Sequence, residues 1–306
     1  MLSKGLKIGW IGTGVMGAPM CGHLMDKLGH QTLVYNRTKS KAQSLFDRGA
    51  KYMQPQEIAR EADFLFLMLG YPHDVEAMTL GPDGVVQHMK EGAVLIDHTT
   101  SSPNLAEQIH EEAKKRGVGS IDAPVSGGDI GAKNGEVVAM CGGEEDVFEN
   151  TLPLLETFSK AAELMGGPGK GQHTKCVNQI MIASAMVGLS EAMVYSHKAG
   201  LEIAPWIELL NGGAAGNFSL ERLGPRMLKR DFEPGFYAEH FIKDLGIALD
   251  EARKMGLSLP GTSNAHQLYL SLAANDGGRD GTQAILKVHE KLNNVELPAQ
   301  KTDPKA

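Results

Sequence analysis

The sequence predicts an α/β N-terminal half built on a doubly wound parallel sheet, joined by a long interdomain helix to an all-helical C-terminal half. Short apolar runs alternate with helical patterns up to about residue 165, and no strand pattern follows. A glycine-rich break at 166–171 precedes the long helix. We place the first domain at 1–168 and the helical domain at 169–295. Residues 296–306 carry proline and charge without periodicity, so we expect a frayed tail there.

The composition is that of an ordinary globular protein. With 306 residues, 42% of them hydrophobic, and a formal net charge of -7, the chain is long enough for two domains and too acidic for a nucleic-acid surface. It shows neither a signal-peptide pattern nor an uninterrupted apolar stretch of membrane-spanning length. We therefore expect a cytoplasmic protein without a membrane or nucleic-acid partner. The cysteines and histidines show no metal-ligand spacing, so we predict no metal and three buried thiols, at Cys21, Cys141 and Cys176.

A glycine motif near the start predicts a nucleotide site. The apolar run at 7–11 ends in this motif, and a helical pattern follows it. In a Rossmann-type domain the first glycine makes the tight turn, the second lets the pyrophosphate approach, and the third lets helix and strand pack closely. We predict that a dinucleotide is bound by Gly12, Thr13, Gly14, Val15, Met16 and Gly17.

The end of the second apolar run, at 32–35, predicts which dinucleotide is bound. An NAD site places Asp or Glu here, whereas this chain has Asn36, Arg37 and Thr38. A guanidinium and a hydroxyl suit a 2′-phosphate, because the arginine fork can make two charge-assisted bonds to it. We therefore expect NADP (NADPH) in preference to NAD. The alternative is a solvated arginine in a turn that opens the next helix.

Ligands of such sheets bind beyond the carboxyl ends of the strands. Met68 ends one predicted strand, at 64–68, and Leu69 follows it, while Thr100 follows another, so we expect all three beside the cofactor. The segment DAPVSGG, at 122–128, follows the next strand. Its backbone N–H groups and the Ser126 hydroxyl can point at an anion, which predicts a carboxylate substrate. The alternative is a glycine-rich turn without chemistry.

The long helix is apolar on nearly every face from Lys175 to Val194, so we expect it to be buried between other elements. Near its start stand Lys175, Asn178 and Gln179, spaced i, i+3 and i+4, which share one face. This cluster outlines a site. The alternative is a solvated lysine in a first turn whose amides cap the helix.

The chain carries four separated motifs, which are GTGVMG, DAPVSGG, GKGQHTKCVNQ, and FEPGF (232–236) with HFIKDL (240–245). In these motifs and their order the sequence resembles the β-hydroxyacid dehydrogenase family over nearly the whole chain. This family includes 3-hydroxyisobutyrate dehydrogenase, tartronate semialdehyde reductase and glyoxylate/succinic semialdehyde reductases, with 6-phosphogluconate dehydrogenase as a larger relative. Two departures are Gln179, where many members carry a second asparagine, and His98, where small or apolar residues are usual.

The resemblance implies roles for particular residues. It implies a catalytic Lys175 with Asn178 or Gln179 as its amide neighbour, and it leaves open which amide contacts the substrate. It also implies a homodimer or homotetramer formed through the helical domain. The remaining implied contacts are Ser126, Gly127 and Gly128 with the substrate carboxylate, Thr100 with nicotinamide and substrate, Lys243 with the cofactor, and Phe236 and Asp244 with the substrate pocket.

Charge then predicts the reaction. A lysine has an ordinary pKa of about 10.4, so at neutral pH it is already the acid that the reduction of a carbonyl needs. We expect an NADPH-dependent reductase of a small aldehyde acid or 2-oxo acid, which in reverse oxidises a 3-hydroxy acid. Two alternatives remain, an imine reductase and a non-catalytic NADP-binding module. Lys175 counts against both, because imine reductases usually replace this lysine and non-catalytic relatives have lost it.

Overall fold

The computed structural model describes residues 5–29 and 31–299. The chain divides into two compact units, Met1–Lys175 and Cys176–Ala306, which we call the N-terminal and C-terminal units. Of the tail expected at 296–306, residues 300–306 lie outside the described part. Within it, Leu297 is buried and donates its backbone N–H to the Glu290 carboxylate at 2.9 Å.

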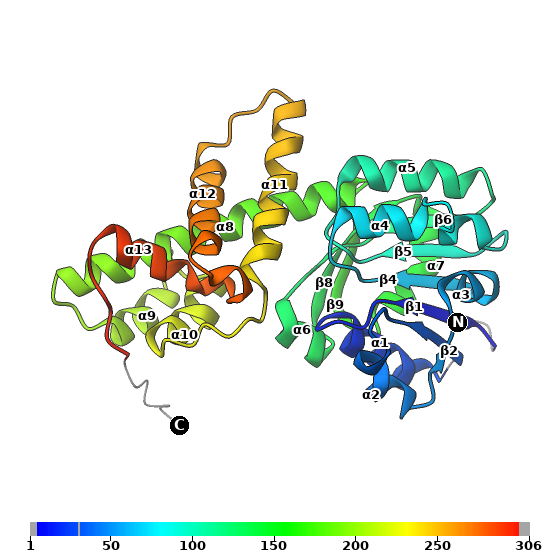
Figure 1. Cartoon of the computed structure of the whole chain (residues 1–306), viewed down its shortest axis with the longest axis horizontal. Coiled ribbons are helices and arrows are strands. Elements are labelled where there is room, and N and C mark those ends of the chain that lie inside the picture. The colour runs from blue at the N-terminus through cyan, green and yellow to red at the C-terminus, as the bar shows by residue number, and fades with distance from the viewer. Residues whose placement is uncertain (1–4, 30, 300–306) are drawn as a thin grey trace. The chain divides into compact units, whose positions relative to one another are not determined.

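The N-terminal unit is an α/β domain with helices on both faces of its sheet, as Figure 1 shows. Its strands are β1 (Lys7–Ile11), β2 (Gln31–Tyr35), β3 (Lys51–Tyr52), β4 (Phe64–Leu67), β5 (Val94–Asp97), β6 (Gly119–Asp122), β7 (Val125–Ser126), β8 (Val137–Gly143) and β9 (Ser159–Leu164). Its helices are α1 (Gly17–Leu28), η1 (Lys39–Ala42), α2 (Gln43–Phe46), α3 (Pro55–Glu61), α4 (Pro72–Thr79), η2 (Val85–His88), α5 (Pro103–Lys114), α6 (Gly128–Asn134) and α7 (Glu145–Leu155).

The strand order is β3-β2-β1-β4-β5-β6-β8-β7, and β9 pairs with β8. The first six strands, β1 to β6, all run parallel, which confirms the predicted doubly wound sheet. The direction of winding reverses between β1 and β4, the position where such sheets bind ligands. One part of the sheet differs from a purely parallel arrangement, because β8 is antiparallel to β6 and β7. The β7 to β8 connection is shorter than the dozen or so residues that a parallel crossover needs.

Alternating side chains of the central strands fill two cores. Trp10 and Phe66 point to the face covered by α1 and α7, where their rings stack with centroids 5.1 Å apart. Ile11 and Leu67, the next residues along β1 and β4, point to the opposite face and pack with residues of α3, α4 and α5. Because strand side chains alternate with period two, a continuous apolar strand serves both faces.

Helix α8 (Lys170–Lys198) begins in the N-terminal unit and continues into the C-terminal unit. The expectation that it is buried on every side is wrong for one face, where Val177, Met181 and Tyr195 are 61%, 69% and 72% exposed. Met186 and Met193 lie on the packed side and are fully buried. Among the described residues, α8 alone is long and apolar enough to cross a membrane, with 39% of its most apolar window buried. A core helix of a soluble protein passes the same test, so this is weak evidence for a span.

The C-terminal unit is helical, as predicted. Its core includes Phe241 and Tyr269, whose rings meet edge to face with centroids 4.9 Å apart. Beyond α8 its helices are α9 (Ile203–Asn211), η3 (Ser219–Leu223), α10 (Gly224–Leu228), α11 (Ala238–Lys254), α12 (Pro260–Ala274), η4 (Gly277–Arg279), η5 (Thr282–Ile285) and α13 (Leu286–Leu292).

Candidate active site

The glycine turn after β1 has the geometry that its sequence predicts. Gly12 has φ +97°, and a Cβ there would lie 2.2 Å from the Met68 carbonyl oxygen, so only glycine passes this close to the end of β4. A Cβ at Gly17 would meet the Gly12 carbonyl oxygen at 2.1 Å. At Gly14, by contrast, a Cβ would meet no described atom within 4 Å, and the neighbouring Val15 is half exposed. This open backbone before the N-terminus of α1 fits a dinucleotide pyrophosphate.

Asn36 ties the end of β2 to this turn. Its Oδ1 accepts the backbone N–H of Thr13 at 2.9 Å, and its Nδ2 donates to the Thr38 carbonyl at 2.8 Å. Arg37 and Thr38 are exposed beside it. The structure thus brings the predicted cofactor residues of β1 and β2 together, with Asn36 serving as a link between them.

The carboxyl ends of β1, β4 and β5 also meet. The N–H of Met68 donates to the Ile11 carbonyl at 2.9 Å, and the N–H of Leu69 donates to the Thr99 hydroxyl at 2.8 Å. Thr100 follows directly and is partly buried. Met68, Leu69 and Thr100 therefore lie at the edge of the sheet where ligands of this architecture bind.

Lys175 lies against the DAPVSGG segment. Its Nζ donates to the Val125 carbonyl at 2.9 Å, and the side chain is largely buried, with the residue 7% exposed. Ser126, the next residue, pairs with Val138 of β8. Ser126, Gly127 and Gly128 are all partly exposed. The ammonium group and the predicted carboxylate-binding segment are therefore neighbours.

Asp122 is a residue of this region whose contacts sequence reasoning missed. Its carboxylate accepts the backbone N–H groups of Gly169 and Gln172, each at 2.8 Å. The Gln172 side chain donates to the Thr99 carbonyl and accepts the Ser101 N–H, at 2.8 and 2.9 Å. Burial raises the pKa of Asp122 to about 7, while the two N–H groups favour its ionised form. One signal was available, because α8 starts in a glycine-rich run without a Ser, Thr, Asp or Asn cap for its first N–H groups.

The structure accounts for His98 as a core residue. The ring is fully buried and stacks on Trp10 and Phe66, with centroids 6.0 and 5.7 Å away. Its Nδ1 lies 2.7 Å from the Ala123 carbonyl oxygen, so the neutral ring carries its proton there. Burial lowers the pKa of His98 to about 4, against the opposing effect of this hydrogen bond.

Four predicted residues are linked within the C-terminal unit. Gln179 Nε2 donates to Asp244 Oδ2 at 2.5 Å, and Asn178 Nδ2 donates to Gln179 Oε1 at 2.7 Å. Lys243 Nζ lies 2.9 Å from Asp244 Oδ1 as an ion pair. An ammonium, a carboxylate and two amides therefore form one continuous chain of contacts.

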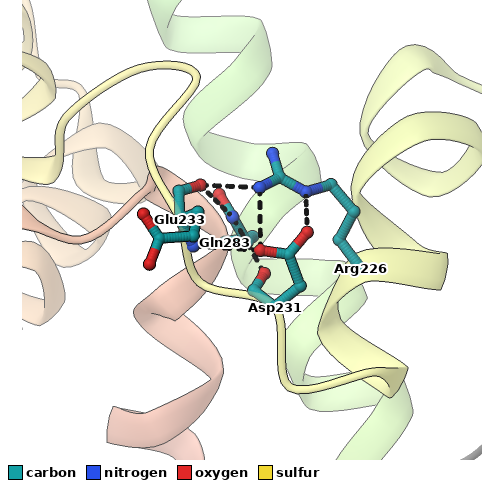
Figure 2. A network of polar contacts seen from close by, with 4 residues as sticks. All are labelled: Arg226, Asp231, Glu233 and Gln283. Atoms are coloured by element: carbon teal, nitrogen blue, oxygen red, sulfur yellow. Dashed lines mark hydrogen bonds and ion pairs between the residues drawn. The ribbon is translucent and has the colours of Figure 1, made fainter.

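A second network holds the FEPGF segment, whose last residue is Phe236. Figure 2 shows Arg226 forked onto the Asp231 carboxylate, at 2.7 and 3.0 Å, and donating to the Glu233 carbonyl at 2.7 Å. Gln283 Nε2 donates to the carbonyls of Asp231 and Glu233, each at 3.0 Å (Figure 2). The loop is thus fixed from two sides, and its last residue, Phe236, is partly buried.

Two family models match the chain. The model of the NAD binding domain of 6-phosphogluconate dehydrogenase matches residues 7–174. The model described as NAD-binding of NADP-dependent 3-hydroxyisobutyrate dehydrogenase matches residues 169–289. Together they span the N-terminal unit and most of the C-terminal unit.

Individual relatives agree with these matches. Probable 3-hydroxyisobutyrate dehydrogenase-like 1, mitochondrial, of Arabidopsis thaliana is 51% identical over 293 residues, 95% of this chain and 87% of that protein. The 2-hydroxy-3-oxopropionate reductase of Escherichia coli (strain K12) is 35% identical over 95% of this chain and all of its own length. The structure of Mycobacterium tuberculosis 3-hydroxyisobutyrate dehydrogenase with L-serine superposes with a TM-score of 0.84 at 28% identity, covering 93% of this chain and 99% of that one. This chain belongs to the β-hydroxyacid dehydrogenase family and is an NAD(P)-dependent oxidoreductase.

Proposed function

We propose that the protein reduces a small aldehyde acid or 2-oxo acid with NADPH, and that Lys175 is the general acid. The observation that carries this proposal is the buried Lys175 ammonium, held 2.9 Å from the carbonyl of Val125, the residue that precedes Ser126. A cation fixed next to a predicted carboxylate-binding segment suits a substrate that carries a carbonyl close to its carboxylate.

The chemistry follows from where charge develops. When bound, the reduced cofactor supplies the hydride that adds to the carbonyl carbon. The carbonyl oxygen then gains negative charge, and the Lys175 ammonium stabilises it and donates a proton, which yields the hydroxy acid. In the reverse direction the neutral amine takes the hydroxyl proton. The bond to Val125 holds the nitrogen in place, so little reorganisation is needed during the reaction.

For the substrate carboxylate we propose Ser126 with the backbone N–H groups of Gly127 and Gly128. Asn178 lies one turn beyond Lys175 on α8 and is partly exposed, so we propose it as the amide that contacts the substrate. Gln179 already uses both polar atoms of its side chain on Asp244 and Asn178.

For the cofactor we propose NADPH, with Arg37 on the 2′-phosphate. Asn36 stands where NAD sites place an acid, and its side-chain Oδ1 already accepts the backbone N–H of Thr13. The exposed Arg37 and Thr38 next to it offer a guanidinium and a hydroxyl to a phosphate.

The test is a substrate panel followed by loss of NADPH absorbance. It should contain small aldehyde acids, 2-oxo acids and sugar acids, each paired with an aldehyde or ketone of the same skeleton that lacks the carboxylate. We expect turnover with at least one acid, a large loss for its uncharged partner, and a kcat lowered about 10²- to 10⁴-fold in Lys175→Ala. Silence across the panel would overturn the proposal, and equal use of the uncharged partners would remove the carboxylate site from it.

We also propose that a second copy of the chain covers the exposed face of α8. Val177, Met181 and Tyr195 fall on one side of this helix, and apolar groups exposed together in this way are typical of association surfaces. Sedimentation of Met181→Asp should show smaller particles than the unmodified protein. A monomeric unmodified protein would contradict this.

A further inference from the structure

The first two turns of α8 contact the β6–β7 segment at two levels. At the first level, Asp122 accepts the N–H groups of Gly169 and Gln172. At the second, Lys175 Nζ donates to the Val125 carbonyl. The two levels are three residues apart on both segments, since Val125 follows Asp122 and Lys175 follows Gln172 by that spacing. The lysine therefore sits one turn above the contact made by Asp122.

Glycines let the helix start approach the carboxylate this closely. A Cβ at Gly171 would lie 2.4 Å from the carbonyl oxygens of both Asp122 and Met140. A Cβ at Gly142, which pairs with Asp122 across the sheet, would lie 2.6 Å from Asp122 Oδ1 and from the Gly171 nitrogen. Both clashes are with atoms that cannot rotate away freely, so larger residues would separate α8 from the sheet.

The Asp122 carboxylate takes the place of a helix cap. The first N–H groups of a helix lack partners within the helix, and they favour a negative charge. Asp122 meets this need from a strand, with the residue only 6% exposed. The Gln172 side chain adds a second tie, to the Thr99 carbonyl and the Ser101 N–H. The helix start is thus fixed to the ends of both β5 and β6.

We propose that Asp122 is a positioning residue for Lys175, because it fixes the helical turn from which the lysine reaches the Val125 carbonyl. The inference rests on the proposed role of Lys175 as general acid. Asp122 contacts the backbone of α8 and acts only through the placement of Lys175. Loss of this contact should let the ammonium move relative to Ser126, and displacements of about 1 Å can lower turnover by about a hundredfold.

The first test is Asp122→Asn in the full chain. Asparagine keeps one acceptor oxygen but turns an N–H₂ group toward a backbone donor, so one of the two bonds is lost. We expect kcat to fall about ten- to a hundredfold with little change in KM for NADPH, and the amide protons of Gly169 and Gln172 to exchange faster. The matched control is Asp63→Asn. This variant also replaces a carboxylate that accepts a backbone N–H, that of Lys7, but Asp63 precedes β4 and so lies at the amino ends of the strands, away from the ligand-binding carboxyl ends. This control should leave unchanged both kcat and the exchange rates of the Gly169 and Gln172 amide protons.

The second test leaves the carboxylate intact. Gly171→Ala should displace the start of α8 and lower kcat in the same way. Gly261→Ala is its matched control, since both glycines are the second residue of their helix and a Cβ at Gly261 would meet no described atom within 4 Å. If Asp122→Asn fails to fold, Gly171→Ala still tests whether the position of the α8 start controls kcat, and unchanged kcat in a folded Gly171→Ala with a displaced helix start would contradict the inference.

The outcomes separate this inference from the function on which it rests. Suppose that kcat falls in Lys175→Ala, whereas in Asp122→Asn the amide protons of Gly169 and Gln172 exchange faster at unchanged kcat. The positioning role is then wrong and the general acid stands. If the amide protons of Gly169 and Gln172 exchange as slowly in Asp122→Asn as in the wild type, the inference is also overturned, whatever the activity. If Lys175→Ala keeps full turnover, both the general acid and the positioning role fail.

Discussion

Gln179 on α8 and Asp244 on α11 are joined by a hydrogen bond, and the two residues are only 1% and 2% exposed. The amide nitrogen of Gln179 serves this carboxylate, and its oxygen serves Asn178. Lys243 neutralises Asp244 from the other side at 2.9 Å. A buried carboxylate needs such partners, so Gln179 has a structural task and the less buried Asn178 is the better candidate for substrate contact.

We therefore expect the two amides to respond differently to replacement. Gln179→Ala should lower the free energy of unfolding by about 1 to 3 kcal/mol, because Asp244 loses a donor. Asn178→Ala should raise KM for the substrate about tenfold, the value of one hydrogen bond, with little change in stability. Urea unfolding and steady-state kinetics measure both effects. The reverse pattern, a silent Asn178→Ala and a raised KM in a stable Gln179→Ala, would reassign the contact to Gln179.

The general acid itself is tested by Lys175→Ala. General acid catalysis contributes about 10²- to 10⁴-fold, so kcat should fall within that range. NADPH affinity, measured by cofactor fluorescence, should change little, because the glycine turn lies on a different element. Lys170→Ala, an exposed lysine in the first turn of the same helix, is the control and should keep wild-type turnover. A fully active Lys175→Ala would remove the lysine from the mechanism.

Local patterns were sufficient to predict most of the longer elements of the fold, but short ones such as β3, α3, β7 and α6 were not predicted. The glycine turn could be predicted in detail because Gly12 and Gly17 are needed by sterics that are fixed once a strand, a turn and a helix follow each other. The partly exposed face of α8 could not be predicted. Met181 and Met186 are equally apolar, and only the packing of the C-terminal unit makes one exposed and the other buried.

Contacts between distant segments could not be predicted. Asp122 and its two donors are 47 and 50 residues apart, and nothing in the chain near Asp122 indicates which N–H groups it meets. His98 had no explanation in the sequence because its partner, the Ala123 carbonyl, is a backbone group on the neighbouring strand end. The candidate site was therefore predictable as a set of residues, while the contacts that hold it in place were not.

Cofactor preference is tested at Arg37. Hydrogen bonds to a charged group are worth about 1.5 to 3 kcal/mol, so Arg37→Ala should lower kcat/KM for NADPH about ten- to a hundredfold and leave NADH unaffected. The preference should shrink as salt rises past about 0.1 M, because Arg37 is exposed.

A double variant tests the same site in the other direction. Asn36→Asp keeps the acceptor for the Thr13 N–H and adds an acceptor for a ribose hydroxyl, so combined with Arg37→Ala it should favour NADH. Lys41→Ala, an exposed lysine in η1, is the control and should keep the wild-type preference. An unmodified protein that uses both cofactors equally would show that Arg37 is only a turn residue.

The buried His98 predicts a pH dependence of stability. Its pKa is about 4 in the folded protein and 6.5 ordinarily, so between these values the unfolded chain binds the extra proton. The contribution of the neutral His98 ring to the free energy of unfolding is fully present above about pH 6.5 and is lost as the pH falls toward 4. This difference in the pKa of His98 corresponds to about 3 kcal/mol in the free energy of unfolding.

The pH dependence that Asp122 contributes has the opposite sign. Because the pKa of Asp122 is raised in the folded protein, the folded state loses stability as the pH rises from 3.8 to about 7.

These opposing contributions are separated by comparing variants. His98→Phe keeps the stacking on Trp10 and Phe66 but loses the bond to Ala123, so it should be less stable than the wild type at pH 7. Between pH 7 and pH 4.5 the free energy of unfolding of the wild type should fall by about 2 to 3 kcal/mol relative to that of His98→Phe, which closes or reverses the gap. Only the wild type loses stability through His98, while Asp122 and the other carboxyls titrate in both proteins. Urea unfolding at several pH values measures this gap. His73→Phe, at a side chain that is 76% exposed, should run parallel to the wild type at every pH. A gap between His98→Phe and the wild type that does not change with pH would mean that His98 is protonated as easily in the folded protein as in the unfolded chain.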